Sequence, residues 1–221
     1  MTWQYALVAV IGYLCGAVPS GLWVGKVARG IDIREFGSGK TGFTNSMRVL
    51  GWKLAVVVFL LDLIKGAVPV LIARLFFNGA PVQAVAGIAA MVGHVWPVYV
   101  GFRGGRAVLV AFAATTVMMP LLGPIMIAIG LAIALPFGYI SLASVVGSGV
   151  MAGIIAALAF LDRVPPELRV PHAYGVFGVV AATMIVVLHR DNIQRLRAGT
   201  EPKFGQGGQR RRGPGRADSR P

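Results

Sequence analysis

The stretch AVLVAFAATTVMMPLLGPIMIAIGLAIALPFGYI, residues 107–140, carries no charged side chain. A membrane helix needs about 20 apolar residues at about 1.5 Å per residue, so this stretch is too long for one ordinary span. Pro120 and Pro124 lie in its middle, and proline breaks a helix because it has no N–H to donate. The stretch therefore predicts two short membrane helices, about 107–119 and 121–137.

Five further apolar runs flank this pair, and each has about the length of a membrane helix. The chain is 56% hydrophobic and only 13% charged, whereas a soluble domain carries about 25% charged residues. We therefore predict an all-α integral membrane protein, a seven-span helical bundle with glycine-rich cytoplasmic loops. The five flanking runs cover about 3–24, 54–77, 82–100, 140–161 and 172–188.

Positive charge gathers at particular connections between these runs. The formal net charge is +13, and nine of the 21 Lys and Arg lie within 190–221 while six lie within 26–53. Basic residues near spans mark the cytoplasmic side of a membrane. Seven spans place these two regions and residues 101–106 on one side, whereas six would separate them. We therefore predict a multi-pass protein of the cell membrane with its N-terminus outside and its C-terminus in the cytoplasm.

The same charge is also typical of nucleic-acid-binding proteins. Because most of the basic residues flank the apolar runs, we expect a lipid bilayer around the chain and no nucleic-acid partner. Residues 205–221 are rich in Gly, Arg, Gln and Pro without apolar periodicity, which predicts a disordered basic tail after a membrane-embedded domain of residues 1–204. A monomer is favoured, although nothing in the sequence fixes the oligomeric state.

The reactive side chains that bind metals are sparse. A single cysteine, Cys15, excludes an internal disulfide. The three histidines lie far apart, without the spacing of metal ligands. We therefore expect neither a metal nor another cofactor.

The most polar segment between the first and last runs is GSGKTGFTNSMR, residues 37–48. Its glycines fit G-x-G-x-x-G and its GKT resembles the end of a P-loop, but both motifs need a preceding β-strand, and a P-loop would need glycine in place of Arg34. A glycine-rich turn still presents backbone N–H groups to an anion, and Lys40 and Arg48 add positive charge. A solvated cytoplasmic loop is the alternative.

Two other polar segments are expected on the same side of the membrane. GFRGGR, residues 101–106, places two adjacent glycines between two guanidiniums, and HRDN, residues 189–192, closes the last run. His189 and Asn192 share a face of a helix because they are three residues apart. Together with residues 37–48, these segments suggest a substrate with phosphate groups, with plain loops and a helix cap as the alternatives.

Two polar pairs lie within the apolar runs. Asp62 and Lys65 have opposite charges and lie three residues apart. They predict an ion pair, because isolated charges at membrane depth are costly. Ser141 and Ser144 begin the sixth run, where their hydroxyls either donate to a bound anion or bond their own helix.

These segments resemble the bacterial membrane-integral glycerol-3-phosphate acyltransferases that use acyl phosphate as the donor. The resemblance implies an enzyme of the inner membrane that transfers a fatty acyl group from acyl phosphate to the first hydroxyl of glycerol 3-phosphate, giving lysophosphatidate and phosphate for phospholipid biosynthesis. It is carried by GAVPSG (16–21), IDIREFGSGKTGFTNSMRVLG (31–51), LDLIKG (61–66), GHVWPVYVGFRGG (93–105) and HRDNIQRLRAGTEPKF (189–204).

The resemblance and the polarity of these segments give a set of candidate site residues. We expect the acceptor hydroxyl to attack the acyl carbonyl directly, with a substrate phosphate or His189 taking its proton; a covalent acyl-Ser38 is the alternative. The candidate catalytic residues are Ser38, Arg106, His189 and Asn192. The candidate substrate-binding residues are Gly37, Gly39, Lys40, Thr44, Asn45, Arg48, Arg103, Gly104, Gly105, Ser141 and Ser144.

The chain departs from the family pattern at the expected site. The family usually has Asn where this chain has Lys40, Ala where it has Phe43, and Lys-Gly-Val-Ala-Thr where residues 106–110 read RAVLV. Arginine keeps the charge of lysine but is larger and planar, and Ala107 removes a glycine. These departures favour, as the main alternative, a diverged, non-catalytic homologue that binds lipid phosphates. A small-anion transporter is the second alternative, because broken helices and glycine-rich segments also suit transporters.

Overall fold

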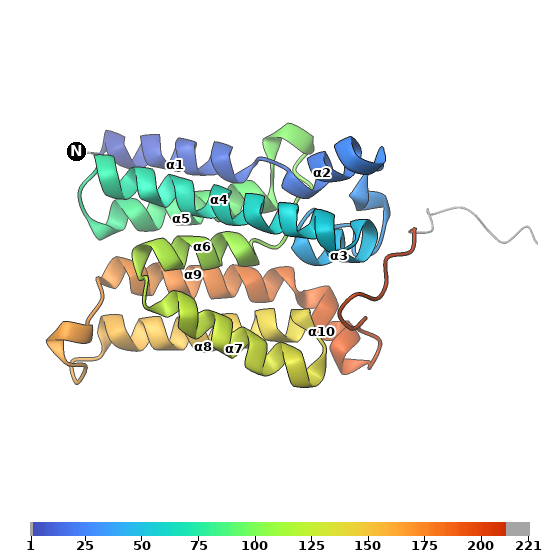
Figure 1. Cartoon of the computed structure of the whole chain (residues 1–221). Coiled ribbons are helices and arrows are strands. Elements are labelled where there is room, and N and C mark those ends of the chain that lie inside the picture. The colour runs from blue at the N-terminus through green and yellow to red at the C-terminus, as the bar shows by residue number, and fades with distance from the viewer. Residues whose placement is uncertain (1, 211–221) are drawn as a thin grey trace, which may run out of the picture.

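The computed structural model describes residues 2–210, which form a bundle of helices without any strand in that range (Figure 1). Short 3-10 turns occupy Ile33–Glu35, Val98–Val100 and Pro166–Leu168. The α-helices are α1 (Trp3–Gly16), α2 (Ser20–Arg29), α3 (Phe43–Leu50), α4 (Trp52–Phe76), α5 (Ala80–Val95), α6 (Val108–Met118), α7 (Leu122–Phe137), α8 (Ile140–Phe160), α9 (His172–Leu188) and α10 (Arg190–Arg197).

All seven predicted apolar runs are helical. By length and composition, four helical stretches suit a membrane crossing, and a fifth does so if the bent pair α9 and α10 is one span. The helices α6 and α7 are apolar but shorter. The number of spans therefore stays a prediction. The four long stretches are Trp3–Arg29, Trp52–Phe76, Ala80–Val100 and Ile140–Phe160.

The helix break that the sequence predicted at Pro120 is present, and a second break lies at Pro19. α1 ends at Gly16 and α2 begins at Ser20, directly after Pro19. α6 ends at Met118 and α7 begins at Leu122, with Pro120 between them. In each case proline interrupts the ladder of helix hydrogen bonds because it has no N–H.

Small residues let the helices of the first half pack closely, as is common between membrane helices. A side chain at Gly16 of α1 would overlap the backbone of Ala90 in α5, and one at Gly66 of α4 would meet the backbone of Val110 in α6. The first contact fixes α1 against α5, and the second fixes α6 against α4. The second contact therefore also fixes the segment 101–107 that leads into α6.

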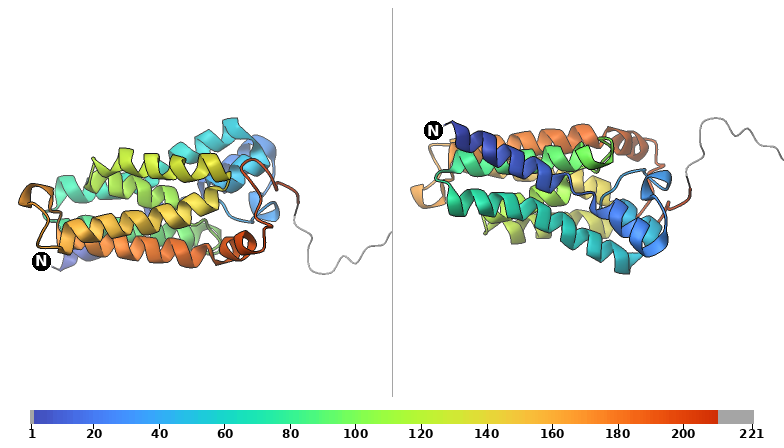
Figure 2. Two further views of the ribbon diagram at one scale, coloured as in Figure 1. Left: turned by 90° about the horizontal axis from the view of Figure 1, so that it is seen from below. Right: turned by 90° about the horizontal axis from the view of Figure 1, so that it is seen from above.

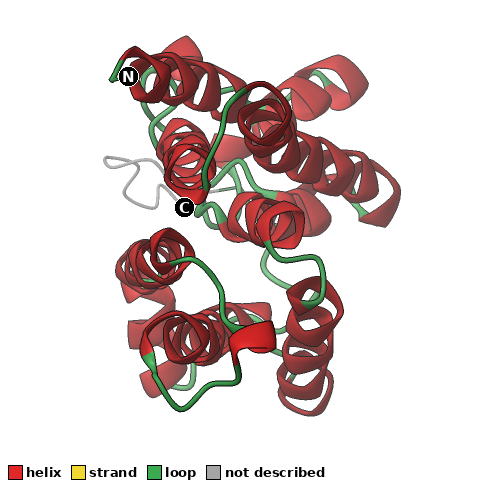
Figure 3. Ribbon diagram, turned by 90° about the vertical axis from the view of Figure 1, so that its left-hand side faces the viewer, coloured by secondary structure: helices red, strands yellow, loops and turns green. Residues whose placement is uncertain are grey.

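The polar segments gather at one end of the bundle. The N-terminus and the connection between α8 and α9 lie at one end, while α2, α3 and α10 lie at the other (Figures 1 and 2). Seen end-on, the helices around α8 and α9 form a second group beside the group around α1 and α5 (Figure 3). The alternative of a solvated loop over 37–48 is wrong for its second half, because residues 43–50 form α3.

The described part of the predicted tail lies against the loop that precedes α3. Gln209 accepts a hydrogen bond from the N–H of Gly37 at 2.9 Å, and Arg210 forms an ion pair with Glu35 at 2.9 Å. The rest of the predicted tail, residues 211–221, lies outside the described residues. The disordered tail therefore stays a prediction.

Candidate functional site

The loop before α3 turns at two glycines. Gly37 and Gly39 have φ angles of +54° and +70°, which favour glycine because it has no Cβ. The N–H of Gly37 donates to Gln209, that of Ser38 to the side-chain oxygen of Asn45 at 2.9 Å, and that of Gly39 to a carbonyl within the turn. Our prediction of an anion-binding nest is wrong for these three N–H groups, because they hold the loop together.

Asn45 is the centre of this loop. Its side-chain nitrogen lies 2.9–3.2 Å from the carbonyl oxygens of Ile33, Phe36 and Lys40, and its oxygen accepts from Ser38. The residue is 2% exposed. Since both polar atoms are occupied by the backbone, the geometry favours a positioning role for Asn45 over direct contact with a substrate.

The start of α3 supplies the anion-binding feature that the turn lacks. α3 follows Gly42, which has no side chain that could cap the helix N-terminus. The first N–H groups of a helix have no partner within the helix and carry its positive dipole, so they favour an anion. Gly42, Phe43 and Thr44 line a polar pocket together with Ser38 and Lys40.

The double glycine of the second polar segment serves close packing. The N–H groups of Gly104 and Gly105 donate to the carbonyls of Val95 and His94, both at 3.1 Å. A side chain at Gly105 would overlap the ring of His94. These glycines therefore bring the chain against the end of α5, and their N–H groups do not face an anion.

The two arginines of this segment lie in different places. Arg103 is exposed, whereas Arg106 lines the polar pocket. The Nε of Arg106 is buried and has no hydrogen-bond partner within residues 2–210. Burial lowers the pKa of Arg106 to about 10, against the opposing attraction of Glu201. The guanidinium therefore stays protonated at neutral pH.

Glu201 joins the end of α10 to the rest of the site, and our sequence reasoning missed it. Its carboxylate accepts hydrogen bonds from Ser141 at 2.8 Å, Asn192 at 2.7 Å and Arg195 at 2.7 Å. Arg48 lies 3.9 Å from it. Burial raises the pKa of Glu201, but these hydrogen bonds outweigh burial and hold it below its ordinary value. Ser141 and Asn192 thus support a carboxylate. A signal was available, since Glu201 is the one acid between Asp191 and Asp218 in a basic stretch.

His189 and Ser144 reach the pocket from α9 and α8. His189 is 3% exposed, and its Nδ1 lies 2.8 Å from the carbonyl oxygen of Ile185. A proton on Nδ1 donates to this carbonyl and leaves Nε2 as a proton acceptor. The hydroxyl of Ser144 donates to the carbonyl of Ile140 at 2.9 Å. Ser144 was expected either to donate to a bound anion or to bond its own helix, and in the structure it bonds its own helix.

The predicted pair of α4 forms, and it belongs to the same pocket. Lys65 Nζ lies 2.8 Å from Asp62 Oδ1, which confirms the ion pair. It also donates to the carbonyl of Val18, in the break between α1 and α2, and to the hydroxyl of Ser20, the first residue of α2. Asp62 lines the polar pocket together with His94, whose Nδ1 lies 3.9 Å away. The sequence pattern favours a structural role for Asp62 over a functional one and indicates no site role for His94. Their ionisable side chains at membrane depth were the signal for a site.

The three polar segments therefore converge on one pocket of about 100 Å³. The predicted residues that line it are Ser38, Lys40, Thr44, Asn45, Arg106, Ser144 and His189. The predicted residues outside its lining, within the described range, are Gly37, Gly39, Arg48, Arg103, Gly104, Gly105, Ser141 and Asn192.

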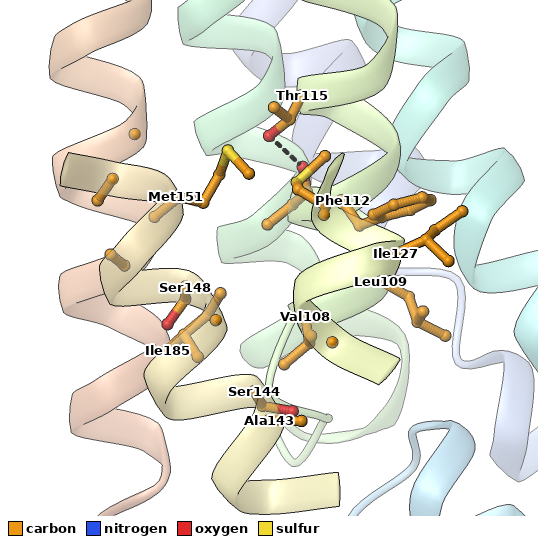
Figure 4. A pocket seen from close by; sticks show the side chains of 18 of the residues that line it. Val108, Leu109, Phe112, Thr115, Ile127, Ala143, Ser144, Ser148, Met151 and Ile185 are labelled. Atoms are coloured by element: carbon orange, nitrogen blue, oxygen red, sulfur yellow. Dashed lines mark hydrogen bonds between the residues drawn. The ribbon is translucent and has the colours of Figure 1, made fainter. Parts of the chain in front are cut away.

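An apolar cavity of about 490 Å³ adjoins this pocket. It lies among α6, α7, α8 and α9, and Figure 4 shows Ser144 near one end and Thr115 near the other. The two spaces share lining residues, namely Phe43, Val108, Leu109, Ile140 and Ser144. A polar headgroup and an attached hydrocarbon chain can therefore occupy them together.

Comparisons with known proteins agree with this geometry. The family model described as glycerol-3-phosphate acyltransferase matches residues 6–199. The chain is 42% identical over 204 residues to a glycerol-3-phosphate acyltransferase of Parasynechococcus marenigrum (90% of each chain). It is 38% identical over 200 residues to one of Thermoanaerobacter sp. (90% of this chain, 96% of that one).

A solved structure matches over the same range. It is the glycerol 3-phosphate form of PlsY (YgiH), an integral membrane glycerol 3-phosphate acyltransferase. The TM-score is 0.82 at 32% identity, and the match covers 91% of this chain and 96% of that one. The similarity therefore covers the helices that build the pocket and the cavity.

Proposed function

The chain belongs to the glycerol-3-phosphate acyltransferase family, and we propose that it transfers a fatty acyl group from acyl phosphate to the first hydroxyl of glycerol 3-phosphate. It is an integral membrane acyltransferase of phospholipid synthesis. The observation that carries the choice of donor is the continuity between a small polar pocket and a long apolar cavity.

The polar pocket suits phosphate groups. The N-terminus of α3 and the protonated guanidinium of Arg106 both face it, and Lys40 lines it. A helix N-terminus and an arginine are the two donors that proteins most readily offer to phosphate. The Nε of Arg106 has no hydrogen-bond partner within residues 2–210, so a bound phosphate oxygen would satisfy a donor that is costly to leave buried alone.

The apolar cavity suits the fatty chain of the donor. Its volume of about 490 Å³ falls within the range of about 300–1,000 Å³ that is usual for ligand sites. The adjoining polar pocket is only about 100 Å³, which favours a small headgroup such as phosphate over a large carrier. A histidine four residues before an aspartate, typical of thioester-using acyltransferases, is absent from the sequence.

In the proposed reaction the hydroxyl oxygen of glycerol 3-phosphate attacks the acyl carbonyl carbon. The bond between this carbon and the phosphate oxygen breaks, and inorganic phosphate leaves. The hydroxyl proton passes to a substrate phosphate oxygen or to Nε2 of His189. Because the donor carries a good leaving group, the protein needs mainly to position two substrates and to stabilise negative charge. Ser38 and Arg106 are the proposed stabilising groups.

The other residues take supporting roles in this proposal. Asn45 holds the loop before α3, while Ser141, Asn192 and Arg48 surround Glu201.

The membrane-embedded domain of residues 1–204 is proposed to cross the bilayer seven times, with the N-terminus outside and the tail of residues 205–221 in the cytoplasm. Labelling of Thr2→Cys and Gly205→Cys in a Cys15→Ser background by an impermeant maleimide tests this topology. Equal labelling of both in sealed inside-out vesicles would contradict it.

The first experiment measures phosphate release by the purified protein in lipid, given palmitoyl phosphate with and without glycerol 3-phosphate. We expect release that depends on the acceptor and that falls about a hundredfold or more in Ser38→Ala, as when one oxyanion donor is removed. Ser46→Ala is the matched control, because its hydroxyl donates to the carbonyl of Gly42, the residue before α3, and Ser46 is not part of the pocket lining.

Three outcomes would redirect the proposal. Absence of release while glycerol 3-phosphate still binds would favour the non-catalytic homologue. Trapping of an acyl group on Ser38 would replace direct attack by a covalent route. Solute uptake into vesicles without an acyl donor would revive the transporter.

A further inference from the structure

The apolar cavity has a length that its lining residues define. Along α8 the lining residues Ser144, Gly147, Met151 and Ile155 recur every three or four positions, so they form one face of the helix. From Ser144 to Ile155, at about 1.5 Å per residue, the cavity extends about 16 Å. The hydrocarbon core of a bilayer is roughly 30 Å thick, so one lipid chain spans about half of it. The cavity therefore has about the length of one lipid chain.

The far end of the cavity is a rigid wall. Phe177 is 0% exposed and Ile155 is 1% exposed. A Cβ at Gly87 of α5 would lie 2.8 Å from the ring of Phe177, so this ring is held tightly between helices. The hydroxyl of Thr115 donates to its own helix at 2.8 Å (Figure 4) and is not available as a donor to a polar group in the cavity.

Met151 lies just before this wall. Its side chain is buried and extends from α8 toward α6, close to Thr115, as Figure 4 shows. Methionine is unbranched and flexible, so its thioether can move where a branched side chain cannot. A chain that enters from the polar pocket therefore meets a movable side chain first and the fixed wall of Ile155 and Phe177 behind it.

We propose that Met151 sets the longest fatty acyl chain that the site accepts. The proposal rests on the acyl-phosphate function above and names a residue that selects among its donors. A chain that ends before Met151 fills the cavity, and each added methylene that is buried improves binding about fourfold. A longer chain must push the thioether against the rigid wall, which removes this gain.

The test is a competition among saturated acyl phosphates of 12 to 20 carbons, with the lysophosphatidate products resolved by mass spectrometry. Met151→Ala removes three heavy atoms and is expected to move the preferred donor about two carbons longer. Gly147→Leu narrows the cavity one helical turn nearer the pocket and is expected to move it to shorter chains. A Cβ at Gly147 has ordinary contact with Ile129 at 3.7 Å, so the backbone tolerates the change.

Matched controls separate length selection from general damage. Gly149→Leu places the same side chain on α8 where, apart from its chain neighbours and the adjoining backbone of α8, no atom of the described residues lies within 4 Å of the new Cβ. Met184→Ala removes the same atoms from α9 outside the cavity lining. Both controls should keep the wild-type preference. Donor partitioning into the micelles is the same for all variants and cancels in the comparison.

A binding measurement distinguishes failure of the proposed role of Met151 from failure of the proposed function. Alkyl phosphates of the same lengths are scored by the rise in Tm of each variant. If the wild type releases no phosphate with any donor, the acyl-phosphate function fails. The binding series with alkyl phosphates then decides by itself whether Met151 sets the chain length. An unchanged optimum length in Met151→Ala, in turnover or in this series, overturns the assignment of Met151; a shift of about two carbons supports it.

Discussion

Replacement of Glu201 by glutamine should destabilise the whole polar end of the bundle. The Glu201 side chain is 1% exposed and receives three hydrogen bonds of 2.7–2.8 Å from Ser141, Asn192 and Arg195. Glutamine keeps the shape and one acceptor oxygen. It removes the charge, and its amide nitrogen cannot accept the hydrogen bond that Arg195 donates to Oε2.

The magnitude follows from the burial of the partners. Removal of one member of a buried ion pair costs roughly 3–5 kcal/mol, because it leaves an uncompensated charge. Arg48 is 6% exposed and cannot reach water, whereas Arg195 is 36% exposed and can. We therefore expect the lower end, about 3 kcal/mol. At about 2–4 °C per kcal/mol for a chain of this size, Tm falls by roughly 6–12 °C.

The assay is thermal unfolding of the protein in detergent, with Glu167→Gln as the matched control because Glu167 is exposed. The pH dependence gives a second test. The folded pKa of Glu201 lies below its ordinary value of 4.5, so its stabilisation is complete above about pH 4.5 and is lost as the pH falls through the folded pKa. The difference in Tm between wild type and variant should therefore shrink in acid. A fall in Tm no larger than that of Glu167→Gln, or a difference independent of pH, would refute the reasoning.

Three further substitutions test the departures from the family pattern. Arg106→Lys should lower kcat/KM for phosphate release about tenfold, because lysine loses one charge-assisted hydrogen bond to phosphate; a rise would favour a decayed enzyme. Ala107→Gly should raise Tm by about 2 °C. A left-handed alanine costs the folded protein roughly 1–2 kcal/mol, and the greater flexibility of glycine in the unfolded chain offsets about half of this gain. Ala107→Ser should not raise Tm. Phe43→Ala removes an edge contact with Phe59, whose ring centroid lies 5.5 Å away where pocket and cavity meet. It should raise KM for the acyl donor about threefold to tenfold and leave KM for glycerol 3-phosphate unchanged, as steady-state kinetics with each substrate varied will show.

The helices were predictable because each depends on a local signal. An apolar run of sufficient length requires a helix in a bilayer, since no water satisfies its backbone. Pro19 and Pro120 place the two breaks by a property of the residue itself. α3 was missed because its eight residues are half polar and carry no such run, so only its contacts with the neighbouring helices reveal it.

The segments that form the site were predictable, but the arrangement of their side chains and hydrogen bonds was not. Composition brought residues 37–48, 101–106 and 189–192 to one side, and the pocket draws on all three. Composition does not tell which N–H groups the fold already uses. That depends on partners far along the chain, such as Gln209 for Gly37. Glu201 was missed for the same reason, since its partners come from α3, α8 and α10.

The replacement at position 107 bears on whether the chain is a working enzyme. Ala107 has a φ of +58°, a conformation that glycine adopts without strain and alanine adopts at a cost. Hydrogen bonds fix the backbone on both sides, from Gly105 to His94 and from Ala111 to Ala107. The chain therefore bears the strain locally, and Arg106 still lines the pocket. The strain arises from the alanine that replaces the family's glycine, so the activity of Arg106→Lys, and not the backbone at position 107, distinguishes the catalytic proposal from the decayed alternative.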